Sequence, residues 1–359
     1  MRGGSIELRG CSKMLGGRWR LEGGYVETIE QLIFTVKGLV HPPNRVIAYL
    51  RYVIDPSGDR IREGARYKRI YSFEEQLGVI KSKYPQYLYY DYVWDVEVQS
   101  VPHERIRGTY DPSEGLTKLM KRGGTSDPLS LAAKSFAEEL SSASSVDVND
   151  MGISGSLLLS LHTSTSDIDF IVYGVNNSFK ARDALRRLLS EGKSFKRLDQ
   201  ARVRELFEFR ATETPMSYEK FVEQERRKVI QGLYKGYVYF IRFVKDFNEV
   251  GEVYGERRCK GLGSARIKAL VIDDSESLFT PCTYKVKCLE VVEGKVDPAI
   301  LREVTSFRGR FAEQAVKGEI IEVEGRLEEV HFRGSRYQRV VVGAAGDFMV
   351  VLDEVSHEA

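Results

Sequence analysis

The sequence has few of the residues that build disulfide frameworks, zinc sites or membrane spans. It contains only five histidines and four widely spaced cysteines, which are Cys11, Cys259, Cys282 and Cys288. There is no CxxC pair and no flanking histidine that would indicate a zinc site, and we expect all four thiols to be reduced. No apolar run approaches the roughly 20 residues that a membrane helix needs, so we expect a cytoplasmic protein with no membrane partner.

An excess of either charge is also missing. The chain carries 54 Lys and Arg against 52 Asp and Glu, which gives a formal net charge of +2. Any basic surface for nucleic acid must therefore come from local clustering of charges. With 42% hydrophobic and 30% charged residues, the 359-residue chain is typical of a folded protein with a charged surface. Its length suggests about two to three domains.

The first part of the chain, residues 1–125, mixes short strands and helices. Apolar runs at Leu32–Val36 and Arg45–Ile54 predict two neighbouring strands joined through a proline turn. A helix is expected over Pro112–Lys121, with Ser113 as its cap. The glycine-rich segment Lys121–Ser126 is the best candidate linker. We therefore expect an N-terminal α/β region of unknown role over residues 1–125.

The second part, residues 126–250, has a stronger helical pattern. A helix from Pro128, capped by Asp127, is expected to place apolar residues on one face, namely Leu129, Leu131, Ala132, Phe136 and Leu140. Further helices are expected over residues 181–189 and 217–233, followed by an apolar strand over residues 237–244. Strands interleaved with helices predict a mixed layer.

Short strands dominate residues 251–359. They are expected at residues 269–273, 284–292, 318–327 and 339–343, with a helix at residues 298–304. Glycine-containing turns separate the strands, which is typical of a small barrel or sandwich. The fold class predicted for the whole chain is α+β, with a mainly β C-terminal region.

One segment of the second part carries the residues for phosphate and metal chemistry. Gly155-Ser156 follows a short apolar run, and Asp167-Ile168-Asp169 comes about ten residues later. A glycine turn lets backbone amides approach a phosphate, and the Ser156 hydroxyl can donate to it. Residues i and i+2 of a strand point the same way, so Asp167 and Asp169 project together. Two adjacent carboxylates attract a cation, and an oxygen-only set favours Mg²⁺ or Mn²⁺ over zinc.

This pattern resembles the Gly-Ser and Asp-x-Asp signature of the DNA polymerase beta superfamily of nucleotidyltransferases. The whole chain is also similar to an archaeal group of predicted nucleotidyltransferases. The resemblance implies that Gly155 and Ser156 hold a nucleoside triphosphate and that Asp167 and Asp169 hold the metal ions. It implies transfer of a nucleoside monophosphate to a hydroxyl acceptor with release of pyrophosphate.

Two further residues are candidates for nucleotide binding. Ser166 stands next to Asp167, and Arg242 stands inside an apolar strand, where a guanidinium needs an anionic partner. A loop hydrogen bond for Ser166 and a structural salt bridge for Arg242 are the alternatives.

Members of the superfamily usually have a third carboxylate on a neighbouring strand, and the matching strand, Tyr237–Val244, contains none. Asp246, just past its end, is the first candidate for this catalytic role, and Glu249, Glu205 and Glu208 are the others. If none reaches the pair, the alternative is a nucleotide- or RNA-binding module with a degenerate, catalytically weak site.

The sequence leaves the acceptor open among RNA, protein and small molecules. Aromatics alternate with arginines at residues 307–311 and 331–339, which suits RNA contact or simply charged hairpin tips. The charged run at residues 223–228 is interpreted as a solvated helix face with ion pairs. In the first region, a possible surface for anionic ligands is formed by His41-Pro42-Pro43, Arg45, Arg51 and Tyr67-Lys68-Arg69. The sequence suggests no mechanism for it, and a proline-fixed turn without function is the alternative for the first three residues.

Overall fold

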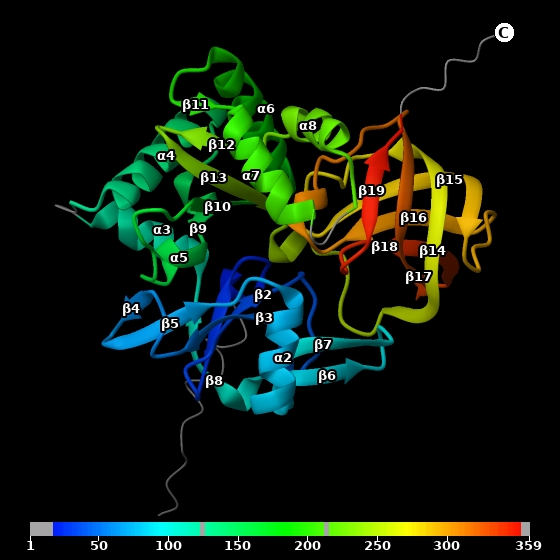
Figure 1. The fold of residues 1–359 in the computed structure, drawn as a ribbon, viewed down its shortest axis with the longest axis horizontal. Coiled ribbons are helices and arrows are strands. Elements are labelled where there is room, and N and C mark those ends of the chain that lie inside the picture. The colour runs from blue at the N-terminus through cyan, green and yellow to red at the C-terminus, as the bar shows by residue number, and fades with distance from the viewer. Residues whose placement is uncertain (1–16, 123–125, 212–214, 353–359) are drawn as a thin grey trace, which may run out of the picture.

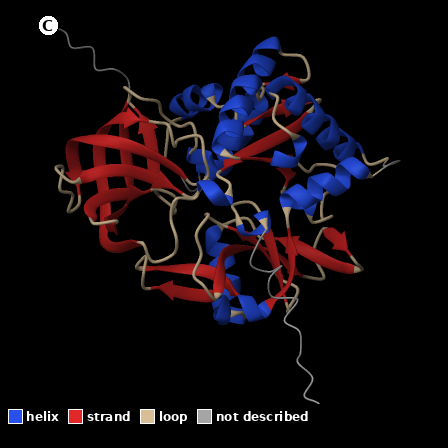
Figure 2. Ribbon diagram, turned by 180° about the vertical axis from the view of Figure 1, so that it is seen from behind, coloured by secondary structure: helices blue, strands red, loops and turns tan. Residues whose placement is uncertain are grey.

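The computed structural model describes residues 17–122, 126–211 and 215–352. The chain is α+β, and its three sheets are built from separate stretches of sequence (Figure 1). Residues 123–125 of the expected linker Lys121–Ser126 lie outside the described residues. Figure 2 shows that helices gather around the central sheet, whereas the C-terminal part is built of strands.

The N-terminal region forms an eight-stranded sheet. Its longest path has the order β4-β5-β3-β2-β1-β8, and β7 joins β3 to β6. The strands are β1 (Tyr25–Thr28), β2 (Ile33–Val36), β3 (Arg45–Ile54), β4 (Arg60–Arg62), β5 (Ala65–Arg69), β6 (Leu88–Asp91), β7 (Val96–Pro102) and β8 (Ile106–Tyr110). The two strands expected from the apolar runs are β2 and β3, which pair antiparallel.

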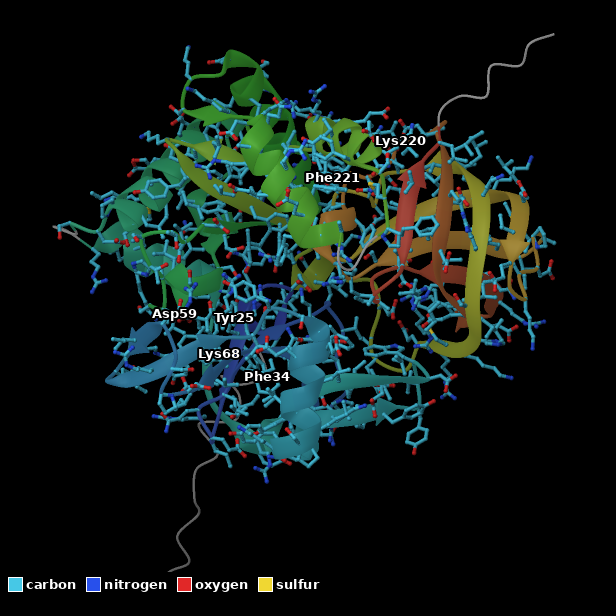
Figure 3. The ribbon with its side chains drawn as sticks, in the orientation of Figure 1. Tyr25, Phe34, Asp59, Lys68, Lys220 and Phe221 are labelled. Atoms are coloured by element: carbon cyan, nitrogen blue, oxygen red, sulfur yellow. The ribbon has the colours of Figure 1, made fainter. Side chains whose placement is uncertain are left out.

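The two faces of this sheet bury different partners. Phe34 packs with helix α2 (Phe73–Lys83) in a core of the region's own. Tyr25 lies on the other face and packs with Leu159 and Leu161 of the central region. Figure 3 labels both side chains, with Tyr25 nearer to the central region. One face of the sheet therefore packs against the central region.

Helix α3 (Pro112–Lys121) has the predicted bounds but a different cap. The carboxylate of Asp111 accepts hydrogen bonds from the backbone N–H groups of Ser113 and Glu114, so Asp111 caps the helix and Ser113 does not. Three short 3-10 helices complete the region: η1 (Arg18–Arg20), η2 (Pro85–Tyr87) and η3 (His103–Arg105).

The central region has a five-stranded sheet of order β11-β12-β13-β10-β9, in which β10 and β13 run parallel. The elements are α4 (Pro128–Ser144), η4 (Val148–Asp150), β9 (Met151–Ile153), α5 (Gly155–Leu158), β10 (Ile168–Tyr173), α6 (Val175–Glu191), β11 (Phe195–Lys196), α7 (Gln200–Ala211), α8 (Tyr218–Arg227), β12 (Gln231–Tyr234), β13 (Tyr237–Val244) and η5 (Phe247–Glu249). Phe136 of α4 packs on Phe170 of β10, so the helix covers the middle of the sheet.

Two helix predictions in this region need correction. Asp127 caps α4 as expected, by accepting from the Ser130 N–H at 2.8 Å, but Leu131 is exposed. Leu131 therefore lies outside the buried face, which Leu129, Ala132, Phe136 and Leu140 form. The helix expected over residues 217–233 ends at Arg227, and the chain then becomes strand β12.

The C-terminal region is a closed barrel. Strand β14 pairs with both β15 and β17, and β18 pairs with β16 and β17, so five strands form a ring. The elements are β14 (Arg257–Asp273), β15 (Cys282–Glu293), β16 (Leu301–Ser306), η6 (Gly309–Phe311), β17 (Ile320–Phe332), β18 (Ser335–Val341) and β19 (Phe348–Val351), the last added to β17. Its strand order and the single parallel pair β16–β18 make it an OB-type barrel.

The helix expected at residues 298–304 is wrong, because strand β16 occupies most of that segment. The cysteines Cys259, Cys282 and Cys288 are free thiols in the described chain. Among the described residues, no helix has both the length and the apolar character needed to span a membrane.

Each region contacts both of the others. The Ser154 hydroxyl donates to the carbonyl of Gly23, which joins the central region to the N-terminal sheet. The Val229 N–H donates to Glu313, which joins the central region to the barrel. The Cys259 N–H donates to the carbonyl of Val93 at 2.8 Å, so the β6–β7 hairpin docks on the barrel. A shared cavity lies where the three regions meet.

Candidate active site

The cavity between the three regions has a volume of about 1410 Å³. Gly155, Asp167 and Asp169 line it from the central region, together with Arg242. The N-terminal sheet and the barrel supply the other walls. The structure therefore brings together the motif residues, on one side of an open space.

The glycine of the motif packs directly against the second aspartate. Gly155 has φ +63°, and a Cβ atom built on it would lie 2.0 Å from Oδ2 of Asp169. The Ser154 N–H donates to the backbone carbonyl of Asp169 at 2.8 Å. Both the left-handed conformation and the close approach require glycine here. This explains why the turn and the acidic strand occur together in the sequence.

The two aspartates share the cavity but differ in their surroundings. Asp169 is half-buried, and its Oδ1 lies 3.3 Å from Nη1 of Arg242. Asp167 lies just before β10 and opens to the cavity. Desolvation by the surrounding protein, followed by the nearby negative charge of Asp169, raises the pKa of Asp167 to about 6. The repulsion expected between paired carboxylates is thus present in this structure.

This donor set fits a divalent cation held by oxygen ligands. The described residues contain no group of three His, Cys, Asp or Glu side chains that could hold a metal ion. Two carboxylates supply only part of the roughly six oxygens that Mg²⁺ takes, so phosphate oxygens and water would supply the rest. Asp167 and Asp169 are the residues that would hold the ion.

Ser156, Ser166 and His162 have local structural surroundings. Ser156 is buried in α5, and its carbonyl accepts from the Leu161 N–H at 2.8 Å. The Ser166 hydroxyl oxygen accepts from the Thr163 N–H at 2.9 Å, which is the loop bond considered as the alternative. Nε2 of His162 lies 3.2 Å from the capping carboxylate of Asp127. Nucleotide binding by Ser156 and Ser166 stays a prediction.

The structure does not place Asp246 at the site. Its Oδ2 accepts from Nη2 of Arg18 at 2.6 Å, and its carboxylate also caps η5. Asp169 is in register with Phe240 on the parallel strand β13. Asp246 lies two residues past the end of β13 and pairs with Arg18, which stacks on Tyr173 at the other end of β10 from Asp169. The expectation that Asp246 completes the carboxylate set is therefore wrong.

The alternative acids divide in the same way. Both carboxylate oxygens of Glu249 accept from the Val175 N–H at 3.0 Å, so this group is committed to the start of α6. Glu249 and Glu205 of α7 both line the cavity, whereas Glu208 is not among the lining residues. The side chain of β13 that reaches Asp169 is a cation, Arg242.

Two arginines of the N-terminal sheet face the aspartate pair. Arg51 on β3 and Arg69 on β5 come from paired strands and line the cavity. Neither forms an ion pair or a side-chain hydrogen bond within the described residues, and Nε of Arg69 is buried without a partner. The Arg69 guanidinium stacks on Tyr71 at 4.6 Å. The sequence marked both residues as possible anion ligands but could not connect them to the motif.

Burial affects these guanidinium groups differently. Desolvation, with a contribution from Arg69, lowers the pKa of Arg51 below its usual range. Desolvation also opposes the charged form of Arg69, but Tyr52, Tyr71 and Asp169 together raise its pKa. Unpaired cations in partly buried positions are costly, and they are satisfied when an anion binds. The wall opposite Asp167 and Asp169 is therefore suited to phosphate.

Comparison with known proteins agrees with the motif. Residues 133–230 match the family model described as a nucleotidyltransferase domain, which spans β9, α5 and β10. The central region belongs to the nucleotidyltransferases.

The chain, which carries this nucleotidyltransferase domain, is also similar to a protein from an archaeon along nearly all of its length. It is 32% identical over 328 residues to the uncharacterized protein MJ1086 of Methanocaldococcus jannaschii. The aligned residues cover 89% of this chain and 94% of that protein. The chain therefore belongs to the same family as that protein. No solved structure matches the chain.

Proposed function

We propose that the protein is a metal-dependent nucleotidyltransferase that moves a nucleoside monophosphate from a nucleoside triphosphate to a hydroxyl acceptor. The observation that carries the proposal is the meeting of Gly155, Asp167 and Asp169 with unpaired Arg51 and Arg69 around one cavity. The carboxylates suit a divalent cation, Mg²⁺ or Mn²⁺, and the arginines suit the phosphates that accompany it.

Different residues would bind or position different parts of the triphosphate and its metal ion. The Gly155 turn lets the triphosphate approach the backbone beside Asp169, where a side chain would leave no room. Arg51 and Arg69 would neutralise the phosphates that leave as pyrophosphate. Arg242, 3.3 Å from Asp169, orients that carboxylate.

The reaction is an in-line displacement at the α-phosphorus. The acceptor oxygen forms a bond to the α-phosphorus, the bond to the bridging oxygen breaks, and pyrophosphate leaves with that electron pair. The acceptor proton passes to water, because the described chain places no third carboxylate beside the pair. A divalent cation on Asp167 and Asp169 would supply polarisation of the phosphate oxygens and offset their charge.

The alternative is a nucleotide- or RNA-binding module that retains the site without efficient turnover. The observation that favours it is the strand β13, which has Arg242 near Asp169 and no acidic residue. In this case triphosphate binds with the cation, and no pyrophosphate is released.

The test is a screen of the four labelled ribonucleoside triphosphates with Mg²⁺ or Mn²⁺ against RNA, protein and small hydroxyl acceptors. We expect pyrophosphate release with one acceptor class and its loss in the Asp167→Asn, Asp169→Asn double variant. Asp183→Asn, an exposed change on α6, is the matched control and should retain activity. Activity that survives the double change would refute the roles of the aspartates, and triphosphate binding without release would favour the binding module.

A further inference from the structure

The cavity is larger than one nucleotide requires. Its 1410 Å³ exceed the roughly 300–1000 Å³ of typical small-molecule sites. It extends from the aspartate pair to the outer surface of the barrel, where Thr283 and Thr305 of adjacent strands line it. A bound triphosphate would therefore leave room for an extended second substrate.

Exposed aromatic rings line this space from all three regions. Tyr71 is 49% exposed, Phe73 40%, Phe209 64% and Phe307 41%. Tyr71 and Phe73 flank the start of α2, Phe209 belongs to α7, and Phe307 follows β16. The rings of Tyr71 and Phe209 meet edge to face at 6.4 Å across the boundary between two regions. Exposed rings in a cleft offer stacking surfaces for nucleobases, whatever the sequence.

The charge of the lining favours a polyanion. The lining residues include fourteen Lys and Arg against eleven Asp and Glu, and two of the eleven acids are the motif aspartates. The chain as a whole is almost balanced, at 54 to 52. The lining therefore has a small excess of basic residues, which becomes larger once a metal ion neutralises the two motif aspartates and which suits the backbone of a nucleic acid strand.

A loop of the barrel extends these features to the reacting atoms. A Cβ atom built on Gly309 would lie 2.9 Å from Cζ of Phe240. Phe240 is in register with Asp169, and Arg242 lies over its ring at 4.9 Å. The segment from Phe307 to Arg310 therefore connects the barrel to the aspartate pair. OB-type barrels bind oligonucleotides through their strands and loops, and here such a barrel faces the cavity.

From these observations we infer that the acceptor is a single-stranded nucleic acid. Its terminal hydroxyl lies at Asp167 and Asp169, and the nucleotides that precede it cross the cavity towards the barrel. The bases stack on Phe209 and Phe307, and the phosphates face the basic lining. This inference rests on the proposed transferase function for the reaction, but the binding of the strand can be measured separately.

The experiment uses the full chain carrying Asp167→Asn and Asp169→Asn, so that binding is measured without turnover. Fluorescence anisotropy with labelled single-stranded RNA and DNA of about 12 nucleotides reports affinity, and a duplex of the same sequence is the comparison. We expect single strands to bind more tightly than the duplex. Adding Phe209→Ala or Phe307→Ala should weaken binding roughly 5- to 150-fold, the range for loss of one stacked base.

Tyr92→Ala is the matched control, because Tyr92 is 85% exposed and does not line the cavity. It should leave affinity unchanged, and thermal melts check that all variants fold. Absence of strand binding, or equal weakening by Tyr92→Ala, would overturn the inference. Transfer to a small molecule or protein without strand binding would overturn it while the transferase stands. Strand binding without transfer to any acceptor would support strand recognition and count against the transferase.

Discussion

Two groups of charges in this protein, one buried and one lining the cavity, differ in how completely they are paired. At the junction of α8 and the barrel, Lys228 is 1% exposed, and its ammonium donates to Glu225 at 2.8 Å, Gln314 at 2.6 Å and the Arg310 carbonyl at 2.6 Å. Its three donors have three acceptors. In the cavity, Arg51 and Arg69 have no such partners among the described residues, and Asp167 faces a like charge. The first group is complete without a ligand, whereas the second is complete only with one.

The largest effect is expected from a change at the junction of α8 and the barrel. Lys228→Met should lower the free energy of unfolding by about 3–5 kcal/mol, because a buried network loses its central ammonium and Glu225 keeps only the Arg210 guanidinium at 3.0 Å. Transferase activity per folded molecule should not change. Urea unfolding measures the first and an assay of the soluble fraction the second. Arg226→Met, an exposed neighbour, is the control, and equal effects of both changes would contradict a structural role for Lys228.

The second largest effect is expected from the buried His41, whose two hydrogen bonds both form only when its ring is neutral. His41 contacts the Arg20 carbonyl through Nε2 at 2.6 Å and the Ile47 N–H through Nδ1 at 3.2 Å, and burial lowers its pKa to about 4. The unfolded chain binds this proton near pH 6.5, so the stabilisation is present above pH 6.5 and is lost as the pH falls towards 4. The loss should reach about 3 kcal/mol.

His41→Asn removes this titration, so its free energy of unfolding should fall less steeply between pH 6.5 and 4 than that of the unchanged protein. His331→Asn is the control, because His331 is 56% exposed. Urea unfolding at each pH gives the comparison. Parallel curves for the His41 variant and the unchanged protein would show that His41 does not carry the effect.

The cavity arginines should affect binding and leave stability intact. Arg51→Gln with Arg69→Gln is expected to raise the KM for triphosphate about 10- to 100-fold, which corresponds to the loss of one or two charge-assisted hydrogen bonds. The thermal melting temperature should stay the same or rise, because unpaired buried cations are removed. Arg66→Gln, exposed on the same strand β5, is the control. A lower melting temperature with unchanged KM would make these arginines structural.

The smallest effect is expected at the arginine-rich hairpin of the barrel. Arg336 pairs with Glu329 at 2.6 Å and Arg333 with Glu256 at 3.2 Å, and both arginines are exposed. Arg336→Ser should change neither the melting temperature nor strand affinity measurably, since exposed pairs contribute little. Arg333 lines the cavity and Arg336 does not, so a loss of strand affinity as large as that of Phe307→Ala would extend the binding surface beyond the cavity to the outer side of this hairpin.

The sequence predicted local features well where one physical rule decided them. The turn at Gly155, the acidic positions before and within β10 and the bounds of α3 and β13 each follow from spacing and apolar pattern. The mainly β C-terminal region could also be predicted, although the sequence did not choose between a barrel and a sandwich. Strand β16 was mistaken for a helix because its pairing with β18 decides its conformation and lies 37 residues away in register, Leu301 to Gln338.

The rest of the site depends on contacts between distant parts of the chain. Asp246 stands two residues past β13, and only the parallel register shows that it is at the wrong end. Lys228 belongs to a charged run typical of an exposed helix face, but the barrel covers it. Arg51 and Arg69 gain their importance from the position of the N-terminal sheet opposite β10, for which no local pattern exists.

The docking of the β6–β7 hairpin on the barrel has a mechanical consequence. The Val93 carbonyl accepts a hydrogen bond from the Cys259 N–H, and Asp95 Oδ2 accepts one from the Gly261 N–H at 2.8 Å. The N-terminal region and the barrel are therefore in direct contact. A protease nick in the connection at residues 251–256 would then leave the two fragments associated. These hydrogen bonds fix the distance between the N-terminal region and the barrel, so we expect the cavity between them to be formed before a substrate binds.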